Sequence, residues 1–252
     1  MSDVQVLASG LSDTGRVRPN NQDSFRVDLE HSLFLVSDGM GGRQAGEIAA
    51  RAVAEALPQV LAAHLPRLRK APFRVVELTL REVILEFSQR LRDETARQAG
   101  LKGMGATLDL LWLQENQAHL VHMGDSRTYL FRQGRLRQLT EDHSVVAILL
   151  KHGDITPEQA VDHPARGQLS RYIGMEGEVY PDVQLIELQS KDRLLLCTDG
   201  LWGMLPDARI AKLLRRYAEP DAACRALVDA ANAQGGKDNI TTVIVERVGT
   251  VV

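Results

Sequence analysis

The stretch "FLVSDGMGGRQAG" (Phe34–Gly46) decides what kind of fold this chain adopts. It runs from an apolar segment into the carboxylate of Asp38 and then into several glycines, after which a helical pattern begins. An unbroken apolar run is typical of a strand that is buried on both faces. A carboxylate at the end of such a strand is unfavourable unless a cation compensates its charge. The stretch therefore indicates a buried strand that delivers a carboxylate to a binding site.

Other segments of the chain extend this pattern into a complete fold. Short apolar runs beside Gly, Asp or Asn predict strands at residues 33–36, 108–113, 118–123, 128–131, 193–197 and 242–245, with a meander that includes a tight turn at 132–135. Apolar spacings of three and four predict helices at residues 49–61, 76–91, 210–217 and 224–231. Helices in pairs and mostly consecutive strands favour antiparallel sheets. We therefore predict an α+β fold, a four-layer αββα sandwich of two mostly antiparallel sheets flanked by helix pairs.

Composition limits the class of protein. The chain has 252 residues, of which 44% are hydrophobic and 25% are charged, as in an ordinary globular protein. A net charge of -3 disfavours broad nucleic-acid binding. The N-terminus lacks a signal-peptide pattern, no stretch is long enough to span a membrane, and two cysteines are too few for a disulfide framework. We expect a cytoplasmic, single-domain protein (1–252) that binds neither nucleic acid nor membrane, with a monomer as the default.

Several aspartates share the context of Asp38. Each lies next to an apolar strand and beside glycine or other turn residues: Asp23, Asp38, Asp125, Asp199 and Asp238. For any single one, a turn-forming role is the more common explanation. Their repetition at the ends of the most apolar strands points instead to one edge of a sandwich where the carboxylates converge.

Clustered carboxylates repel one another, so a site that holds several of them needs cations. The donors are oxygen atoms, which favours Mg²⁺ or Mn²⁺ over Zn²⁺. Asp38 would bridge two metal ions, Gly39 would offer its carbonyl, and the glycines would let the backbone approach the ions closely. Two such ions can hold a hydroxide and stabilise in-line displacement at phosphorus.

Seven segments resemble, in order, the motifs of the metal-dependent serine/threonine protein phosphatases of the protein phosphatase 2C type, in their bacterial branch. They are "VRPNNQDSF" (17–25), "LVSDGMGGRQAGEIAA" (35–50), "MGATL" (104–108), "HMGDSRTYLF" (122–131), "LTEDHS" (139–144), "LLLCTDGLWGML" (194–205) and "GGKDNITTVIV" (235–245). The resemblance covers Leu7 to about Glu246, nearly the whole chain. The fold that it implies is an αββα sandwich, in agreement with the predicted layers.

The resemblance also implies a metal site. Asp38 would bridge two core ions, Mn²⁺ or Mg²⁺, to which Gly39 contributes its carbonyl. Asp199 and Asp238 would ligate one of these ions. Asp23 would belong to the same cluster as an outer or water-mediated ligand.

Two further residues are assigned by the resemblance. Arg18 would bind the phosphate, because a guanidinium offers paired donors to phosphate oxygens. Outside this motif it would be an ordinary solvated arginine. Asp125, together with Asp199, resembles the pair that holds a third, weaker metal ion in bacterial members. A structural aspartate that caps the following Ser-Arg turn explains Asp125 equally well.

The chain departs from the family pattern at two positions. Many members carry an acidic residue at the position of Gln22, and a neutral amide there predicts weaker affinity for the second metal ion. Animal members place a histidine, their proposed general acid, at the position of Met40. The sequence assigns no general acid here: either a metal-bound water protonates the leaving oxygen, or the leaving group needs little help.

Residues 141–180 resemble the family's flap, a subdomain beside the metal site that helps to choose substrates; a plain surface insertion is the alternative. The histidines of this segment, His143, His152 and His163, are expected on the surface or in packing rather than as ligands. Trp112 and Trp202 are expected in core or rim packing, and Cys197 in an apolar strand where it is inert.

Taken together, the residues and the resemblance predict a protein serine/threonine phosphatase. It would hydrolyse phosphoserine and phosphothreonine by a metal-bridged hydroxide, opposing a bacterial serine/threonine kinase and acting on that kinase or its substrates. The alternative is a catalytically weak phosphoprotein-binding regulatory module on the same fold, suggested by Gln22. The complete set of Asp38, Asp199 and Asp238 argues against that alternative. A phosphatase of anti-sigma-factor antagonists is a third option, although such relatives usually carry extra sensory domains.

Overall fold

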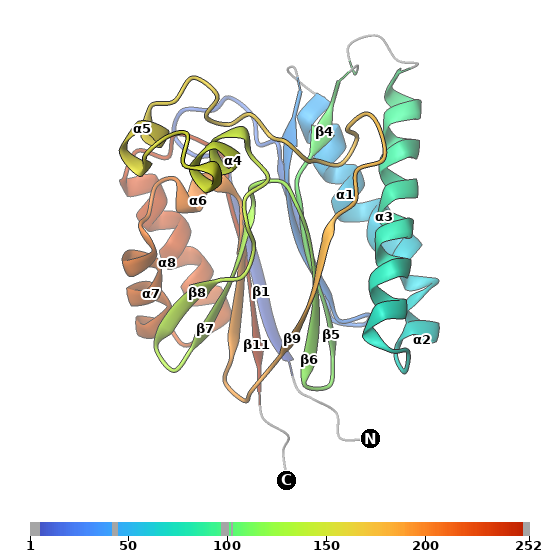
Figure 1. Ribbon diagram of the computed structural model, residues 1–252. Coiled ribbons are helices and arrows are strands. Elements are labelled where there is room, and N and C mark those ends of the chain that lie inside the picture. Colours follow the sequence, from blue (N-terminus) through green and yellow to red (C-terminus); the bar gives the residue numbers. More distant parts are fainter. Residues whose placement is uncertain (1–5, 42–44, 97–100, 102, 249–252) are drawn as a thin grey trace.

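The structure is a computed structural model that describes residues 6–41, 45–96, 101 and 103–248. Two antiparallel sheets form its centre (Figure 1). One has the strand order β2-β3-β5-β6-β9, with bounds β2 (Asp23–Asp28), β3 (Leu33–Met40), β5 (Leu108–Gln114), β6 (Gln117–Met123) and β9 (Asp182–Glu187), and the short β4 (Gly105–Ala106) also pairs with β3. The other has the order β1-β11-β10-β7-β8, with bounds β1 (Val6–Asp13), β11 (Ile240–Arg247), β10 (Arg193–Cys197), β7 (Arg127–Arg132) and β8 (Arg135–Gln138).

Helices cover the outer face of each sheet (Figure 1). The sheet that contains β3 is covered by α1 (Ala45–Ala62), α2 (Leu65–Leu68) and α3 (Phe73–Ala96). The sheet that contains β10 is covered by α6 (Asp199–Trp202), α7 (Asp207–Arg216) and α8 (Pro220–Ala233). The predicted four-layer αββα sandwich of antiparallel sheets is therefore confirmed.

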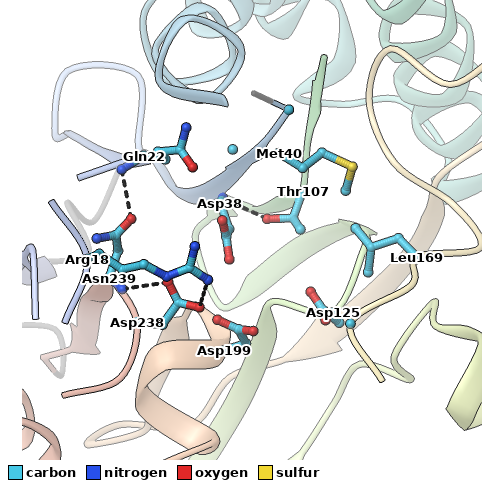
Figure 2. Close-up of a pocket in the computed structure, with 13 residues that line it drawn as sticks. Arg18, Gln22, Asp38, Met40, Thr107, Asp125, Leu169, Asp199, Asp238 and Asn239 are labelled. Atoms are coloured by element: carbon cyan, nitrogen blue, oxygen red, sulfur yellow. Dashed lines mark hydrogen bonds and ion pairs between the residues drawn. The ribbon is translucent and has the colours of Figure 1, made fainter. Parts of the chain in front are cut away.

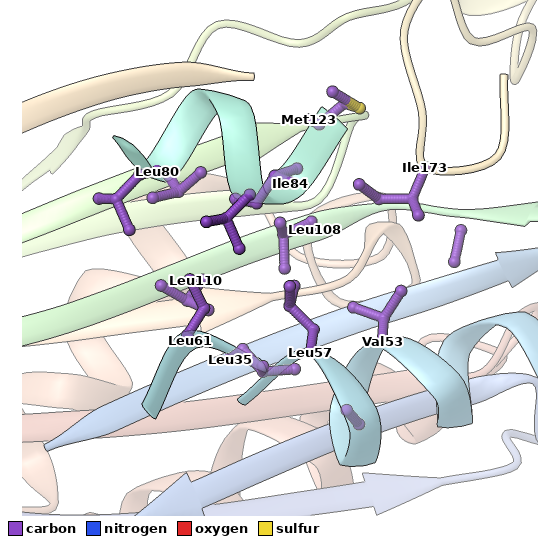
Figure 3. Packing of buried hydrophobic residues seen from close by; sticks show 14 of the residues in the cluster. Leu35, Val53, Leu57, Leu61, Leu80, Ile84, Leu108, Leu110, Met123 and Ile173 are labelled. Atoms are coloured by element: carbon purple, nitrogen blue, oxygen red, sulfur yellow. The ribbon is translucent and has the colours of Figure 1, made fainter. Parts of the chain in front are cut away.

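Alternating side chains on the central strands explain why their sequences are apolar without interruption. In β3, Phe34 and Val36 face the other sheet, whereas Leu33 and Leu35 face the helices. Figure 3 shows the second of these layers, in which Leu35 lies among side chains of α1 and α3, including Leu57. Such strands have no solvent-facing side, so an alternating polar pattern is absent from them.

The predicted meander is wrong in one respect, because its strands belong to different sheets. β5 and β6 pair in one sheet, and β7 and β8 pair in the other. The chain crosses between the sheets at Gly124, whose φ of +120° is in a region that favours glycine. The crossing carries Asp125 to the end of the sandwich where β3 and β10 also finish.

Residues 141–180 run across this end of the sandwich (Figure 1). They contain two short helices, α4 (Val145–His152) and α5 (Pro157–Val161). Isolated bridges join Ser144 to Leu169 and Ile173 to Ala106. We call residues 141–180 the flap segment, and its status as a subdomain of a single domain stays a prediction. Among the helices described, none has both the length and the apolar character required to cross a bilayer.

Candidate active site

Both sheets contribute to a pocket of about 370 Å³ at this end of the sandwich. Figure 2 shows the carboxylates of Asp38, Asp199 and Asp238 pointing toward one another. The lining residues are Arg18, Gln22, Asp38, Gly39, Met40, Gly41, Thr107, Asp125, Gly167, Leu169, Asp199, Asp238 and Asn239. The structure thus brings together every predicted site residue except Asp23, which lies behind the pocket wall.

Asp38 is fixed by its backbone rather than by its side chain. Its N–H donates to Thr107 Oγ1 at 2.8 Å, and its carbonyl accepts from the Thr107 N–H at 2.8 Å. The Ser37 hydroxyl donates to the Thr107 carbonyl at 2.7 Å. The strand continues two residues beyond Asp38 because Gly39 and Met40 pair with β4. The Asp38 carboxylate is thereby left free to face the pocket.

The glycine after Asp38 has a packing role that was not predicted. A Cβ at Gly39 would lie 1.9 Å from the carbonyl oxygen of Gly46, in the first turn of α1. Both residues must be small because the start of α1 packs directly on β3. Gly39 therefore permits close contact between backbones within the protein, and its approach to a metal ion stays a prediction. The intervening residues 42–44 lie outside the described part of the chain.

Asp23 joins the two sheets. It is opposite Asp38 in the register of β2 and β3. Its Oδ2 accepts hydrogen bonds from the hydroxyls of Thr198 at 2.8 Å and Thr241 at 2.7 Å, both from the other sheet. Its Oδ1 is buried and has no hydrogen-bond partner among the described residues. Burial raises the pKa of Asp23 to about 7.

Asp199 begins α6 directly after β10, and its Oδ1 is likewise buried without a partner among the described residues. Burial raises the pKa of Asp199 to about 6, and the nearby Asp238 adds to the shift. The next residue, Gly200, has to be a glycine because a Cβ would lie 1.9 Å from the carbonyl oxygen of Asn239. Close packing of α6 on the start of β11 thus places Asp199 beside Asp238.

Arg18 reaches the site from the loop between β1 and β2. Its Nη2 donates to Asp238 Oδ2 at 2.6 Å, and this hydrogen bond raises the pKa of Arg18. Asn239 organises the loop: its Oδ1 accepts from the Gln22 N–H, and its Nδ2 donates to the carbonyls of Thr14 and Asn20. Half of the Arg18 side chain is exposed, so its guanidinium is accessible to a ligand in the pocket.

Asp125 lies at the crossing between the sheets. The indole N–H of Trp202 donates to the Asp125 carbonyl at 3.0 Å, and the guanidinium of Arg127 lies 3.7 Å from the centre of the Trp202 ring. Burial raises the pKa of Asp125 to about 8, and Asp199 adds to the shift. Trp202 packs at the rim of the site, as predicted, and holds the backbone of Asp125 rather than a ligand.

The electrostatics of this cluster favour bound cations. Burial, followed by repulsion from Asp23, also raises the pKa of Asp38 well above its ordinary value. Buried carboxyl oxygens without partners and an all-oxygen donor set suit Mg²⁺ or Mn²⁺. Within the described residues, however, no three His, Cys, Asp or Glu side chains already surround one ion position. We therefore expect small side-chain adjustments when ions bind.

Sequence reasoning missed the polar residues that hold the aspartates in place: Thr107, Asn239, Thr198 and Thr241. All four are buried. Each is a polar residue at or next to the end of an apolar strand, which is the one signal that would have identified it. They act between strands that are distant in the sequence, and no local pattern shows such pairs.

The flap segment closes one side of the pocket. Gly167 and Leu169 line it. In Figure 2, Leu169 lies opposite Arg18, and Met40 lies on the same side as Leu169. Two of the flap histidines, His143 and His163, are at least partly buried, whereas His152 is exposed, and none of the three lines the pocket. Trp112 is in the core, and Cys197 is buried, which raises the pKa of its thiol.

Comparison with known proteins connects this geometry to a family. A model of the family "Protein phosphatase 2C" matches residues 16–234. The chain is 35% identical over 239 residues to "Serine/threonine phosphatase stp" of Listeria monocytogenes, which covers 94% of each chain.

Solved structures agree with the sequence match. The serine/threonine phosphatase of S. agalactiae superimposes with a TM-score of 0.87 at 31% identity, covering 97% of this chain and 100% of that one. The catalytic domain of serine threonine protein phosphatase PstP in complex with 2 manganese ions gives a TM-score of 0.78 at 32% identity, covering 97% and 99%. Since sequence and structure match along nearly the whole length, the chain belongs to the protein phosphatase 2C family.

Proposed function

We propose that the chain is a metal-dependent phosphatase that hydrolyses phosphoserine and phosphothreonine in proteins. The observation that carries this proposal is the convergence of Asp38, Asp199 and Asp238 from both sheets on one pocket that also holds Arg18. The relatives named as serine/threonine phosphatases support the same activity. No observation on the site or the relatives favours the regulatory-module alternative.

The proposed metal site uses the residues around the pocket. Asp38 would contact both core ions, the Gly39 carbonyl would add a neutral donor, and Asp199 and Asp238 would complete the charge compensation. Asp125 would hold a third ion. When bound, divalent ions supply an activated water and stabilise the charge on a phosphoryl group. We propose Mn²⁺ or Mg²⁺, and the manganese in the PstP structure supports the first.

Arg18 and the flap segment would position the substrate. The guanidinium of Arg18 has donors to spare beside its bond to Asp238, so it can also bind phosphoryl oxygens. Leu169 and Met40 offer an apolar wall on the opposite side of the pocket, which would face the bound phosphopeptide. The Met40 thioether has no proton to donate, so it cannot act as a general acid.

The biological setting is also a proposal. The substrates would be phosphorylated proteins, among them a bacterial serine/threonine kinase and the proteins that it phosphorylates. We propose a cytoplasmic monomer that does not bind nucleic acid, which the net charge of -3 supports.

The first experiment measures phosphate release from a phosphothreonine peptide by the purified protein with Mn²⁺, with Mg²⁺ and with a chelator. We expect release with a divalent ion and none with the chelator. A phosphotyrosine peptide of the same sequence serves as a specificity control. If a folded, Mn²⁺-bound protein releases no phosphate from the phosphothreonine peptide, the proposed activity is wrong.

Arg18→Ala should lower kcat/KM for the phosphothreonine peptide by about 10- to 100-fold, since hydrogen bonds to charged groups contribute about 1.5–3 kcal/mol. Arg18→Lys should recover only part of this loss, because an ammonium lacks the paired donors. Mn²⁺ affinity, measured by calorimetry, should change much less than kcat/KM. An unchanged kcat/KM in Arg18→Ala would exclude the residue as the phosphate-binding group.

Gln22→Glu should lower the Mn²⁺ concentration for half-maximal rate by roughly fivefold, since one extra charge near an ion contributes about 1 kcal/mol. The Gln22 side chain lines the pocket, so the new carboxylate would join an already repelling cluster. We therefore also expect a lower unfolding midpoint in chelator. Identical Mn²⁺ titrations of variant and wild type would show that this position does not tune the site.

A further inference from the structure

A buried histidine near the start of the flap segment contacts the turn that carries Asp125. His143 is 3% exposed, and its ring packs on that of His122 with centroids 4.4 Å apart. It does not line the pocket and has no place in the proposed metal site. It nevertheless forms hydrogen bonds with Gly124, and the next residue, Asp125, lines the pocket.

His143 holds both peptide groups that flank the Gly124 Cα. Its backbone N–H donates to the Gly124 carbonyl at 2.7 Å, and the Gly124 N–H donates to His143 Nδ1 at 3.2 Å. Gly124 needs such restraint because glycine at a φ of +120° is free to adopt other conformations. Asp125 follows immediately, so the backbone angles of Gly124, which lie between these two peptide groups, set where the Asp125 side chain starts.

The ring of His143 is itself fixed by Asp182, the first residue of β9. Only an unprotonated nitrogen can accept a hydrogen bond, so the ring proton is on Nε2, from which it donates to Asp182 Oδ2 at 3.1 Å. Burial lowers the pKa of His143, in keeping with a neutral ring. Asp182 is held by Arg171 Nη1 at 2.7 Å, and the Ser170 N–H donates to the His143 carbonyl at 2.8 Å.

We propose that His143 is a positioning residue that sets the place of the Asp125 carboxylate and ties it to the flap residues Ser170 and Arg171. The inference rests on the proposed ion site at Asp125. Groups that orient a metal ligand without touching the metal typically change affinity by about 10- to 100-fold when they are removed. The affinity for the weakest-bound ion should therefore fall when His143 is replaced, although His143 contributes no ligand atom.

Two substitutions test the contacts of the two ring nitrogens separately, Nδ1 with Gly124 and Nε2 with Asp182. His143→Asn keeps an oxygen near the position of Nδ1, where it can accept from the Gly124 N–H, but it is too short to reach Asp182. His143→Gln keeps a donor toward Asp182 but leaves the Gly124 N–H without its acceptor. Both are neutral and smaller than histidine, and His143→Asn removes more packing than His143→Gln, so lost packing cannot explain a larger effect of His143→Gln.

The readouts are the Mn²⁺ binding isotherm and amide hydrogen exchange of the peptide that contains Gly124, the latter in chelator. His143→Gln should lower the affinity for the weakest-bound Mn²⁺ by about 10-fold or more. It should also speed amide hydrogen exchange at Gly124. His143→Asn should stay within about threefold of the wild type in affinity. Asp125→Ala identifies the ion in question by removing it from the isotherm.

Equal losses in both variants together with equally lowered unfolding midpoints would show a merely structural role and overturn the inference. Wild-type affinity in His143→Gln would also overturn it. If Asp125→Ala leaves the isotherm unchanged, the ion site at Asp125 is absent and the inference falls with it, whereas peptide hydrolysis still tests the proposed function. Should His143→Gln not fold, His143→Leu replaces it, because it also leaves the Gly124 N–H without its acceptor: weaker binding of the weakest-bound Mn²⁺ supports the inference, and unchanged binding overturns it.

Discussion

Asp38→Asn should reduce phosphate release from a phosphothreonine peptide by more than about 1,000-fold. The Asp38 carboxylate lies at the centre of the pocket and faces Asp199 and Asp238 (Figure 2). An amide is neutral, and its nitrogen donates rather than accepts, so it cannot bridge two cations. The measurement is the steady-state rate at saturating Mn²⁺, with Asp229→Asn, an exposed position on α8, as the matched control.

Misfolding should not explain this loss. The hydrogen bonds that fix Asp38 are made by its backbone to Thr107, and the substitution keeps them. The variant also removes one charge from a group of buried, mutually repelling carboxylates, so its unfolding midpoint in chelator should equal or exceed that of the wild type. Near-normal activity in Asp38→Asn would contradict the two-metal site.

The central strands were predictable because the fold leaves them no solvent-facing side. The predicted strand at residues 193–197 coincides with β10, and those at 108–113 and 118–123 match β5 and β6 almost completely. Each lies between the opposite sheet and a helix layer, so its side chains are apolar on both faces. The long helices α1 and α3 were predictable for a related reason, since each buries one apolar stripe.

The bounds of the peripheral strands were not predicted, because these strands are only partly buried. β1, β2, β8 and β9 are the edge strands of the two sheets, and many of their residues are partly exposed and polar. A weak apolar pattern over four to eight residues does not distinguish such a strand from a loop. A local sequence pattern also does not show which sheet a strand joins. For this reason the strands of the predicted meander were assigned to one sheet, whereas the structure divides them between two.

The candidate site was predictable in its chemistry and less so in its geometry. Carboxylates at the ends of apolar strands identified Asp38 and Asp199, because an apolar strand makes an acidic residue conspicuous. The sequence did not show that Asp23 lies behind the pocket, since its position depends on hydroxyls of Thr198 and Thr241 from the opposite sheet. The repeated Asp-Gly pairs have two separate causes. The aspartates supply the chemistry of the site, and the glycines are needed where helices pack closely on strands.

Without metal ions, the free energy of unfolding should fall as the pH rises from about 5.5 to 8.5. Burial raises the pKa of Asp199 to about 6, of Asp23 to about 7 and of Asp125 to about 8, whereas unfolded aspartates ionise near pH 3.8. Between these values the folded state holds protons that the unfolded state has already released. Stability present at low pH is therefore lost as the pH rises through the folded pKa values, which the interacting carboxyls spread over this window.

We expect a loss of at least about 2 kcal/mol across this range in chelator, or roughly 4–8 °C in the unfolding midpoint for a domain of this size. Excess Mn²⁺ should reverse the sign, because ions bind the ionised carboxylates of the folded state and binding strengthens as protons leave. His122, whose pKa Asp109 raises against the effect of burial, adds a metal-independent loss in the same direction. Asp38→Asn should remove most of the stabilisation by Mn²⁺ but keep much of the slope in chelator, because burial is the main cause of the raised pKa values of Asp23, Asp125 and Asp199. A wild-type midpoint that rises with pH in chelator would mean that these carboxyls do not repel one another in the folded protein, and the electrostatic reason for placing cations among them would be lost.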